Sequence, residues 1–123
     1  MQPIGPVIFG EILFDCFPDG SAVLGGAPFH VYVHLGRMGL NPLLITRVGE
    51  DARGADLLKA MRARGLSVEA VQRDSEHFTG EVVVSISDEG HPHFDIRPGQ
   101  AWDAIDGGEA LAVLADKQPS MLY

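Results

Sequence analysis

Several residue types are scarce in this chain of 123 residues, and each scarcity excludes a class of protein. The single cysteine, Cys16, has no partner for an internal disulfide, so disulfide-stapled secreted domains are excluded and a reducing compartment is favoured. Basic residues number 9 against 17 acidic ones, which gives a formal net charge of −8 at pH 7. A nucleic-acid surface needs clustered cations, so nucleic acid is not an expected partner.

Long apolar runs are also missing. None approaches the length that spans a bilayer, and no charged segment followed by an apolar run opens the chain. We therefore expect a cytoplasmic protein without a membrane partner. The remaining composition, with 46% hydrophobic and 21% charged residues, is typical of one globular domain over residues 1–123.

The known signatures of nucleotide, metal and hydrolase sites are absent too. The chain contains no P-loop and no Gly-x-Gly-x-x-Gly at the start of a helix. His91 and His93 lack a third ligand at usable spacing, so a solvated turn is the better interpretation than a metal site. No nucleophile and base can be paired from sequence, and we predict no hydrolytic triad.

The most informative stretch that is present is a pair of glycines followed directly by a helix. Gly25 and Gly26 permit close approach of a ligand to the backbone, Pro28 suits a first helical turn, and Gly39 suits the position after a helix end. This pattern predicts a backbone-lined pocket at a helix N-terminus. Glycine pairs of this kind also occur in loops that bind nothing, and spacing alone leaves that alternative open.

An almost entirely apolar run from Pro6 to Asp15 precedes the glycines and predicts the first central strand of a sheet covered on both faces. Ligands in open α/β sheets gather beyond the carboxyl ends of strands, which would place Asp15 at a binding site. Its carboxylate could accept hydrogen bonds from two neighbouring hydroxyls. Alternatively, Asp15 only opens the turn at residues 17–20.

The following residues alternate between strand and helix patterns. Residues 41–48 predict a second strand, and Asp51 caps a helix that ends at Gly65 and whose apolar face is Ala55, Leu57, Leu58 and Met61. Residues 68–73 predict a third strand. This alternation indicates an α/β fold with a mostly parallel sheet and flanking helices.

A change to period-two alternation then predicts a β-hairpin. Val82 and Val84 precede a turn at residues 88–91, and Phe94 and Ile96 follow it on the same face. An isolated hairpin is marginally stable, so this apolar face must cover something. Packing on the main sheet and closure over a ligand both remain possible. Farther on, a short helix at 109–115 and the start of a buried strand at 120–123 are expected.

Three motifs in this order resemble the amino-terminal part of the ribokinase-like (PfkB) carbohydrate kinases, fructokinases most of all. They are Gly10-Glu11-Ile12-Leu13-Phe14-Asp15, Gly25-Gly26-Ala27-Pro28-Phe29, and Val48-Gly49-Glu50-Asp51-Ala52-Arg53-Gly54. The resemblance covers nearly the whole chain. It implies a partial Rossmann-like sheet with a small β lid, formed by segments of about 16–24 and 79–98, and it makes Gly49, Asp51 and Gly54 a turn scaffold beside the sugar site.

The resemblance also implies which residues bind a small-molecule sugar. Contacts to the sugar would come from Asp15, Gly25, Gly26 and His30, and the lid side chains facing the sugar or a partner sheet would be Val82, Val84, Phe94 and Ile96. The family usually has Asn where this chain has His30, which puts affinity and sugar preference in doubt and makes pH-dependent binding an expectation. A homodimer through the lid hairpin is implied as well.

The catalytic half of the family pattern does not occur in these residues. The resemblance implies ATP and Mg²⁺, a catalytic Asp in Gly-Ala-Gly-Asp and an Asn-x-x-Glu magnesium motif, but neither motif is present. We therefore expect the sugar-binding portion of an ATP-dependent carbohydrate kinase that is inactive on its own. A non-catalytic sugar-binding module or a dimerisation module through the lid is the alternative.

Overall fold

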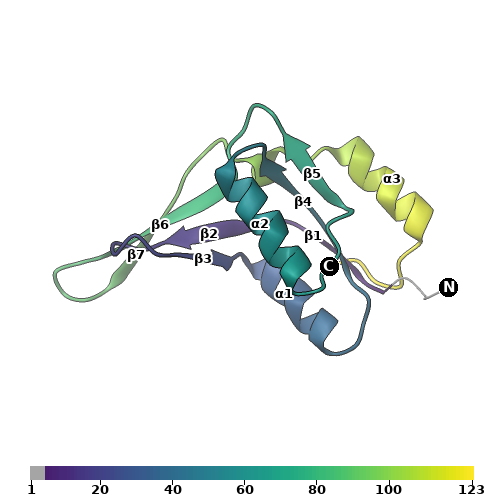
Figure 1. The fold of residues 1–123 in the computed structure, drawn as a ribbon, viewed down its shortest axis with the longest axis horizontal. Helices are drawn as coiled ribbons and strands as arrows, with labels where there is room; N and C mark the ends of the chain where they lie inside the picture. Colours follow the sequence, from purple (N-terminus) through teal and green to yellow (C-terminus); the bar gives the residue numbers. More distant parts are fainter. Residues whose placement is uncertain (1–4) are drawn as a thin grey trace.

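The computed structural model describes residues 5–123 and divides them between an α/β body and a second, smaller sheet (Figure 1). In chain order the elements are β1 (Val7–Phe9), β2 (Leu13–Cys16), β3 (Ala22–Gly25), α1 (Ala27–Arg37), β4 (Leu43–Gly49), α2 (Ala52–Ala63), β5 (Val71–Asp74), β6 (Gly80–Ile86), β7 (Pro92–Ile96), the short 3₁₀ helix η1 (Ala101–Ala104) and α3 (Gly107–Lys117). Among these residues no helix is both long and apolar enough to cross a membrane.

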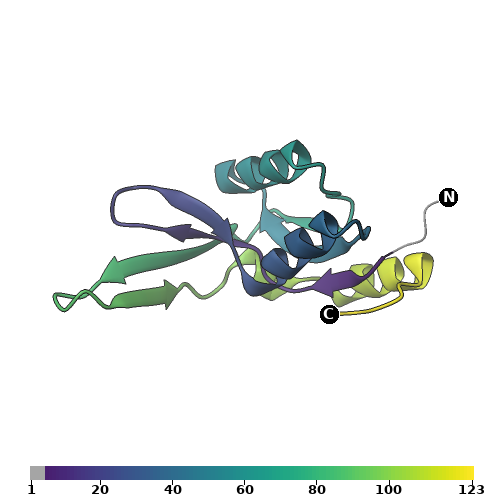
Figure 2. The same ribbon diagram turned by 90° about the horizontal axis from the view of Figure 1, so that it is seen from below.

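The body is a parallel sheet between two layers of helix. Its strand order is β1-β4-β5, with both pairs parallel. On one face Ile8, Leu44 and Val48 pack with α1 and α2, and on the other Val7 and Ile45 pack with α3 (Figure 2). Burial on both faces explains why these strands carry continuous apolar runs. The mixed α/β architecture expected from the sequence is confirmed.

The second sheet consists of two hairpins laid side by side in the order β3-β2-β6-β7. β2 pairs with β3 and β6 with β7 in antiparallel fashion, and β2 joins the hairpins through a parallel pairing with β6. Both hairpins extend together away from the helices (Figures 1 and 2). The hairpin predicted around residues 88–91 is therefore present and belongs to a four-stranded sheet outside the body.

The run from Pro6 to Asp15 is not one strand, contrary to the sequence prediction. β1 ends at Phe9, the chain turns at Gly10, and β2 begins in the other sheet. Gly10 has a φ of 152°, which residues with a side chain rarely adopt, and a Cβ there would lie 2.6 Å from Cγ of Pro28. Asp15 consequently lies within the second sheet and not at the carboxyl end of a body strand.

The predicted starts of the first two helices agree with the structure. Pro28 lies in the first turn of α1, and the Asp51 side chain caps α2 by accepting a hydrogen bond from the Gly54 N–H at 2.8 Å. Within the predicted apolar face of α2, however, Ala55 is exposed, and Gly54 is buried in its place. A Cβ on Gly54 would collide with the backbone of Gly49, so this glycine lets α2 approach β4 closely.

Two further boundaries differ from the prediction. The third strand begins at Val71 and not at residue 68, and α3 extends over Gly107–Lys117 because Asp106 caps it through the Glu109 N–H at 2.9 Å. Residues 121–123 lie beside β1 as a parallel bridge, with Tyr123 donating its N–H to the Val7 carbonyl at 2.9 Å. This isolated bridge falls where the start of a buried strand was expected, but Met121, Leu122 and Tyr123 are about half exposed, so the prediction of burial is wrong.

Candidate functional site

Asp15 is surrounded by apolar side chains on one face of the second sheet. The register places it directly beside Val23 of β3 on one side and Val82 of β6 on the other, and Val82 is in turn opposite Ile96 of β7. Partners in register point to the same face of a sheet. One row across four strands therefore consists of three apolar residues and one carboxylate.

The Asp15 carboxylate is half-buried and has no hydrogen-bond partner among residues 5–123. Gly25 provides the space for it, because a Cβ at Gly25 would lie 2.8 Å from Asp15 Oδ2. Water reaches a half-buried carboxylate, and a ligand that replaces this water must supply hydrogen-bond donors of its own. Two of the residues expected at a sugar site, Asp15 and Gly25, are thus adjacent.

Gly26 connects this face to the start of α1. Its φ is 107°, and a Cβ there would lie 2.9 Å from the Glu11 carbonyl oxygen, so both the conformation and the contact require glycine. As the N-cap of α1, Gly26 offers no side-chain cap, and Pro28 has no N–H. The N–H groups at Ala27 and Phe29 therefore lack a capping side chain, and they lie next to the face that carries Asp15.

The four apolar residues predicted to face a sugar or a partner separate into two groups. Val82 and Val84 are each only 5% exposed, whereas Phe94 is 58% and Ile96 59% exposed. Ile86 and Val23 on the same face are also more than half exposed. Val82 and Val84, at the centre of this face, are thus covered by neighbouring side chains. The large apolar side chains of β7, in contrast, are exposed to solvent.

His30 lies in the first turn of α1 with an exposed side chain. Its ring contacts the Phe29 ring edge-on at a centroid separation of 5.9 Å, and its N–H donates to the Gly26 carbonyl at 3.1 Å in the first turn of the helix. His30 is therefore joined to the predicted site through its backbone, while its side chain forms no hydrogen bond to any residue in 5–123.

Asp51 and Thr79 join the body to the second sheet at the start of β6. Asp51 accepts hydrogen bonds from the Thr79 hydroxyl at 2.6 Å and the Thr79 N–H at 2.9 Å, and Thr79 Oγ1 accepts one from the Gly49 N–H at 2.9 Å. Burial of Asp51 opposes its ionisation, but the hydrogen bonds from Thr79 and Gly54 outweigh it and hold its pKa below the ordinary value. Asp51 therefore acts as scaffold.

A second ionic group stabilises the end of β5. Asp74 is 4% exposed and accepts a hydrogen bond from Arg47 Nε at 2.7 Å, while His77 Nδ1 lies 2.9 Å from the same carboxylate oxygen. The Arg47 hydrogen bond is the main reason that the pKa of Asp74 lies well below its usual range. This group fixes the loop that leads to Thr79.

The opposite face of the second sheet packs on α2. Arg53 lies over the Phe14 ring at 5.1 Å and pairs with Glu81 at 3.2 Å. Cys16 is on this face as well, where burial and the Glu81 charge raise the pKa of its thiol. A thiol in that state is a poor nucleophile.

One hollow beside Gly26 was missed from the sequence. Its volume is about 440 Å³, and its lining includes Gly10, Glu11, Pro28, Trp102 and Asp103. Gly10, an isolated glycine inside an apolar run, was the sequence signal that could have indicated this hollow, since such a residue often marks a close approach of the backbone. None of the eight predicted site residues lines this hollow. Trp102 donates its indole N–H to Gln100 at 2.9 Å.

The described residues also bear on Mg²⁺. Within 5–123 no group of three or more His, Cys, Asp and Glu residues is arranged to hold a metal ion. The part of the chain that the structure describes therefore does not fit a magnesium centre, and we derive no step through one.

Comparison with known proteins gives the context of this geometry. A family model described as pfkB family carbohydrate kinase matches residues 17–106. The chain belongs to the pfkB family of carbohydrate kinases. Fructokinase from Escherichia coli is 31% identical to this pfkB chain over 97 residues, which are 74% of the chain and 32% of the relative. The chain thus spans about a third of the length of the curated relatives it matches.

Solved structures of pfkB fructokinases have the same fold. The fructokinase of Halothermothrix orenii is 25% identical with a TM-score of 0.81, and the match covers 97% of this chain and 45% of that one. A fructokinase from Xylella fastidiosa, described with bound ATP, is 26% identical with a TM-score of 0.68 over 79% of this chain and 32% of its own. The family assignment expected from the three motifs is confirmed.

Proposed function

We propose that this chain provides the sugar-binding side of a cytoplasmic, ATP-dependent carbohydrate kinase with a preference for fructose or a similar ketose. The observation that carries the proposal is the Asp15 carboxylate, which lies beside the side-chain-free Gly25 and has no hydrogen-bond donor among residues 5–123. The pfkB membership and the fructokinase relatives support the substrate class.

Each predicted residue has a physical role in this proposal. Asp15 accepts hydrogen bonds from two neighbouring sugar hydroxyls, which gives orientation as well as affinity. Gly25 and Gly26 let the sugar approach the backbone, and the first-turn N–H groups of α1 can donate to its oxygens. Val82, Val84, Phe94 and Ile96 cover the sugar with an apolar surface, which excludes water during phosphoryl transfer.

His30 has a secondary role in the proposal. We assign His30 a contact with a sugar that reaches past the glycine pair, and its exposure in the first turn of α1 supports this assignment. Its imidazole would do so at an angle and reach that differ from those of the family's asparagine. A substitution at position 30 should therefore change which sugar is preferred more than it changes how tightly a sugar binds.

We propose ATP as the phosphoryl donor because the Xylella fastidiosa fructokinase is described with bound ATP. The 123 residues contain neither Gly-Ala-Gly-Asp nor Asn-x-x-Glu, so we assign no ATP or Mg²⁺ contact within them. Phosphoryl transfer relies on in-line positioning and on stabilisation of charge at the transferred group. Residues 1–123 by themselves are therefore expected to transfer no phosphate.

A matched pair of variants tests the proposal. In the full-length protein, Asp15→Asn removes the acceptor, while Asp95→Asn changes a carboxylate on the opposite face of the same sheet. We expect the Kd for fructose to rise at least about tenfold in the first variant and to stay unchanged in the second. Equal affinities in the two variants, or no sugar binding and no ATP-dependent phosphorylation by the wild type, would refute the proposal.

A second candidate function is self-association through the same face. The specific observation is that Ile86, Phe94 and Ile96 are each more than half exposed although they are large and apolar. Two copies could cover these residues by pairing the second sheets face to face. We expect Phe94→Lys and Ile96→Lys to halve the mass measured by light scattering and Asp95→Lys to leave it unchanged. A monomeric wild type would exclude this candidate.

A further inference from the structure

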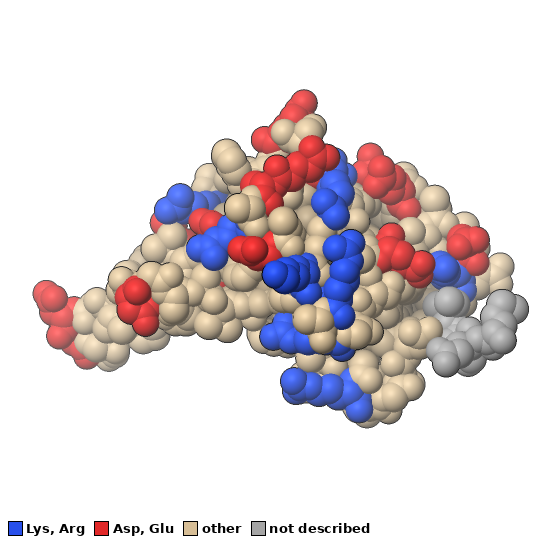
Figure 3. All heavy atoms as spheres, viewed as in Figure 1, with Lys and Arg blue, Asp and Glu red and all other residues tan. Residues whose placement is uncertain are grey.

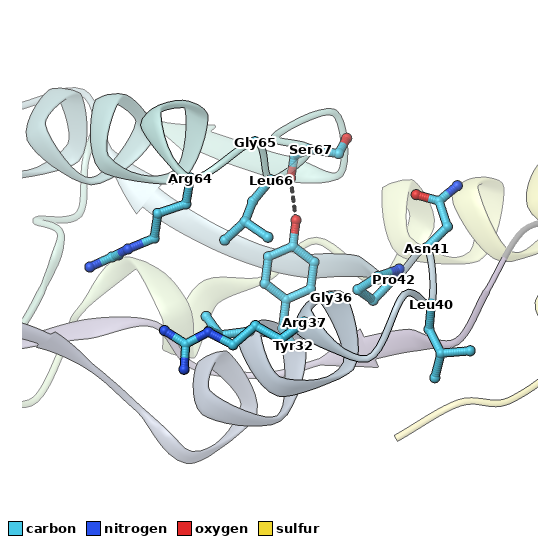
Figure 4. Close-up of a pocket in the computed structure, with 11 residues that line it drawn as sticks. Tyr32, Gly36, Arg37, Leu40, Asn41, Pro42, Arg64, Gly65, Leu66 and Ser67 are labelled. Carbon is cyan, nitrogen blue, oxygen red and sulfur yellow. Dashed lines mark hydrogen bonds between the residues drawn. The ribbon is translucent and has the colours of Figure 1, made fainter.

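A separate hollow lies between the carboxyl-terminal ends of α1 and α2. Its volume is about 410 Å³, and its walls come from α1, from the loop that leads to β4 and from the residues after α2 (Figure 4). The lining includes Tyr32, Gly36, Arg37, Pro42, Arg64 and Leu66. None of the residues assigned to the sugar site takes part in it.

The base of the hollow is rigid. Tyr32 is completely buried, and its hydroxyl donates to the Ser67 carbonyl at 2.8 Å, so its ring is fixed against the loop after α2. Burial raises the pKa of Tyr32 to about 12, and the phenol therefore stays neutral. A Cβ on Gly36 would lie 3.4 Å from Cδ2 of Leu66, which shows how closely α1 and this loop approach.

Charge distinguishes this hollow from the rest of the surface. The chain carries a net charge of −8, yet the lining of the hollow includes two arginines, Arg37 and Arg64, and no carboxylate. Both arginines extend to the same side of the hollow in Figure 4, and basic side chains gather over α1 and α2 in Figure 3. Neither Arg37 nor Arg64 forms an ion pair with any residue in 5–123.

We infer that this hollow binds a small phosphate monoester. Two guanidinium groups on one side provide donors suited to phosphate oxygens, and guanidinium is the preferred partner for such groups. Beside them, Pro42 and Leu66 offer an apolar wall to the carbon part of the ligand. An arginine at a helix end is favourable without any ligand, but that effect does not require two arginines to converge on one concave surface.

The position of the hollow makes it independent of the sugar site. Gly26 lies before the first residue of α1 and Arg37 is its last, so the two ends of this helix are about 16 Å apart. The residues that line the hollow include none of those assigned to the sugar site, so the two sites share no contact residue. Binding at the hollow can be measured whether or not the protein phosphorylates a sugar.

Calorimetry on the full-length protein tests the inference with three probes at matched ionic strength: inorganic phosphate, glycerol 3-phosphate and uncharged glycerol. The double variant Arg37→Gln/Arg64→Gln removes the proposed contacts, and Arg62→Gln removes a neighbouring cation of α2 that does not line the hollow. We expect saturable binding of glycerol 3-phosphate to the wild type and to Arg62→Gln, at least about tenfold weaker binding to the double variant, and none of glycerol.

Three results would overturn the inference: no saturable binding of glycerol 3-phosphate to the wild type, undiminished binding to the double variant, or an equal loss in Arg62→Gln. Tighter binding of inorganic phosphate than of the ester would also overturn it, because the apolar wall would then contribute nothing. Should the double variant fail to fold, the two single variants provide the same comparison, each with about threefold weaker binding expected.

Discussion

The carboxylate of Asp51 holds Thr79 by two hydrogen bonds, at 2.6 Å to the hydroxyl and 2.9 Å to the N–H. Because Asp51 also caps α2 through the Gly54 N–H, a single side chain links the start of a body helix to the point where the chain enters β6. These polar contacts add to the packing of Phe14 in the core of the body in attaching the second sheet.

The first prediction removes the Thr79 hydroxyl. Thr79→Val leaves the buried Gly49 N–H without its acceptor and deprives Asp51 of one donor, so we expect the free energy of unfolding to fall by about 2–4 kcal/mol. Urea denaturation measures the change. Thr79→Ser keeps the hydroxyl and should lose less than half as much; an equal loss in both variants would contradict the assignment of the effect to the hydrogen bonds of the hydroxyl.

The second prediction applies the same substitution to a different threonine. Thr46 is completely buried in β4, and its hydroxyl has no partner among residues 5–123. Replacing it with the isosteric valine removes a desolvated polar group, so Thr46→Val should raise the free energy of unfolding by about 1 kcal/mol. The urea midpoint should rise with an unchanged m-value. A lower midpoint would mean that the hydroxyl finds a partner that the structure does not show.

The third prediction concerns acid stability. The pKa of Asp74 is lower in the folded than in the unfolded chain, so the unfolded chain binds more protons as pH falls. The stability from Asp74 is therefore complete above its unfolded pKa of about 4 and is lost progressively at lower pH. Asp74→Asn should be less stable near neutrality, and its free energy of unfolding should change less between about pH 5 and about pH 3. Parallel pH curves for the two proteins would contradict this assignment.

The fourth prediction tests the space beside Asp15. Gly25→Ala places a methyl group 2.8 Å from the original position of Asp15 Oδ2, and the carboxylate must move although the backbone need not. We expect the Kd for fructose to rise about tenfold with little change in thermal stability. Gly107→Ala, where a methyl group meets nothing within 4 Å, is the matched control and should leave affinity unchanged. Unchanged affinity in both variants would place the sugar elsewhere.

Local signals in the sequence were sufficient for most elements. Pro28 and Asp51 mark helix starts by chemistry that acts within a few residues, and the alternation on either side of residues 88–91 fixes a hairpin without reference to the rest of the chain. Asp15 and Gly25 are neighbours because they lie diagonally across the β2-β3 hairpin, which the sequence did not predict; only the family resemblance implied that both belong to one site.

The features that sequence did not predict depend on tertiary contacts. An unbroken apolar run carries no periodicity, so it cannot show that the chain leaves one sheet at Gly10 and enters another at Leu13. The buried state of Gly54 follows from the approach of α2 to Gly49. The convergence of Arg37 and Arg64 likewise arises only when two helices end side by side. In the sequence these two residues are merely single charges at predicted helix ends.

The attachment of the second sheet has a practical consequence. The chain passes between the sheets near Gly10, Gly26, Thr79 and Gln100, and the bridge from Phe78 to Gln100 ties two of these crossings together. Any tilting of the hairpins about these crossings displaces the tip near Glu89 farther than residues close to Thr79. A fluorophore at Glu89, which is exposed in the turn between β6 and β7, is therefore a sensitive reporter of sheet movement when sugar is added.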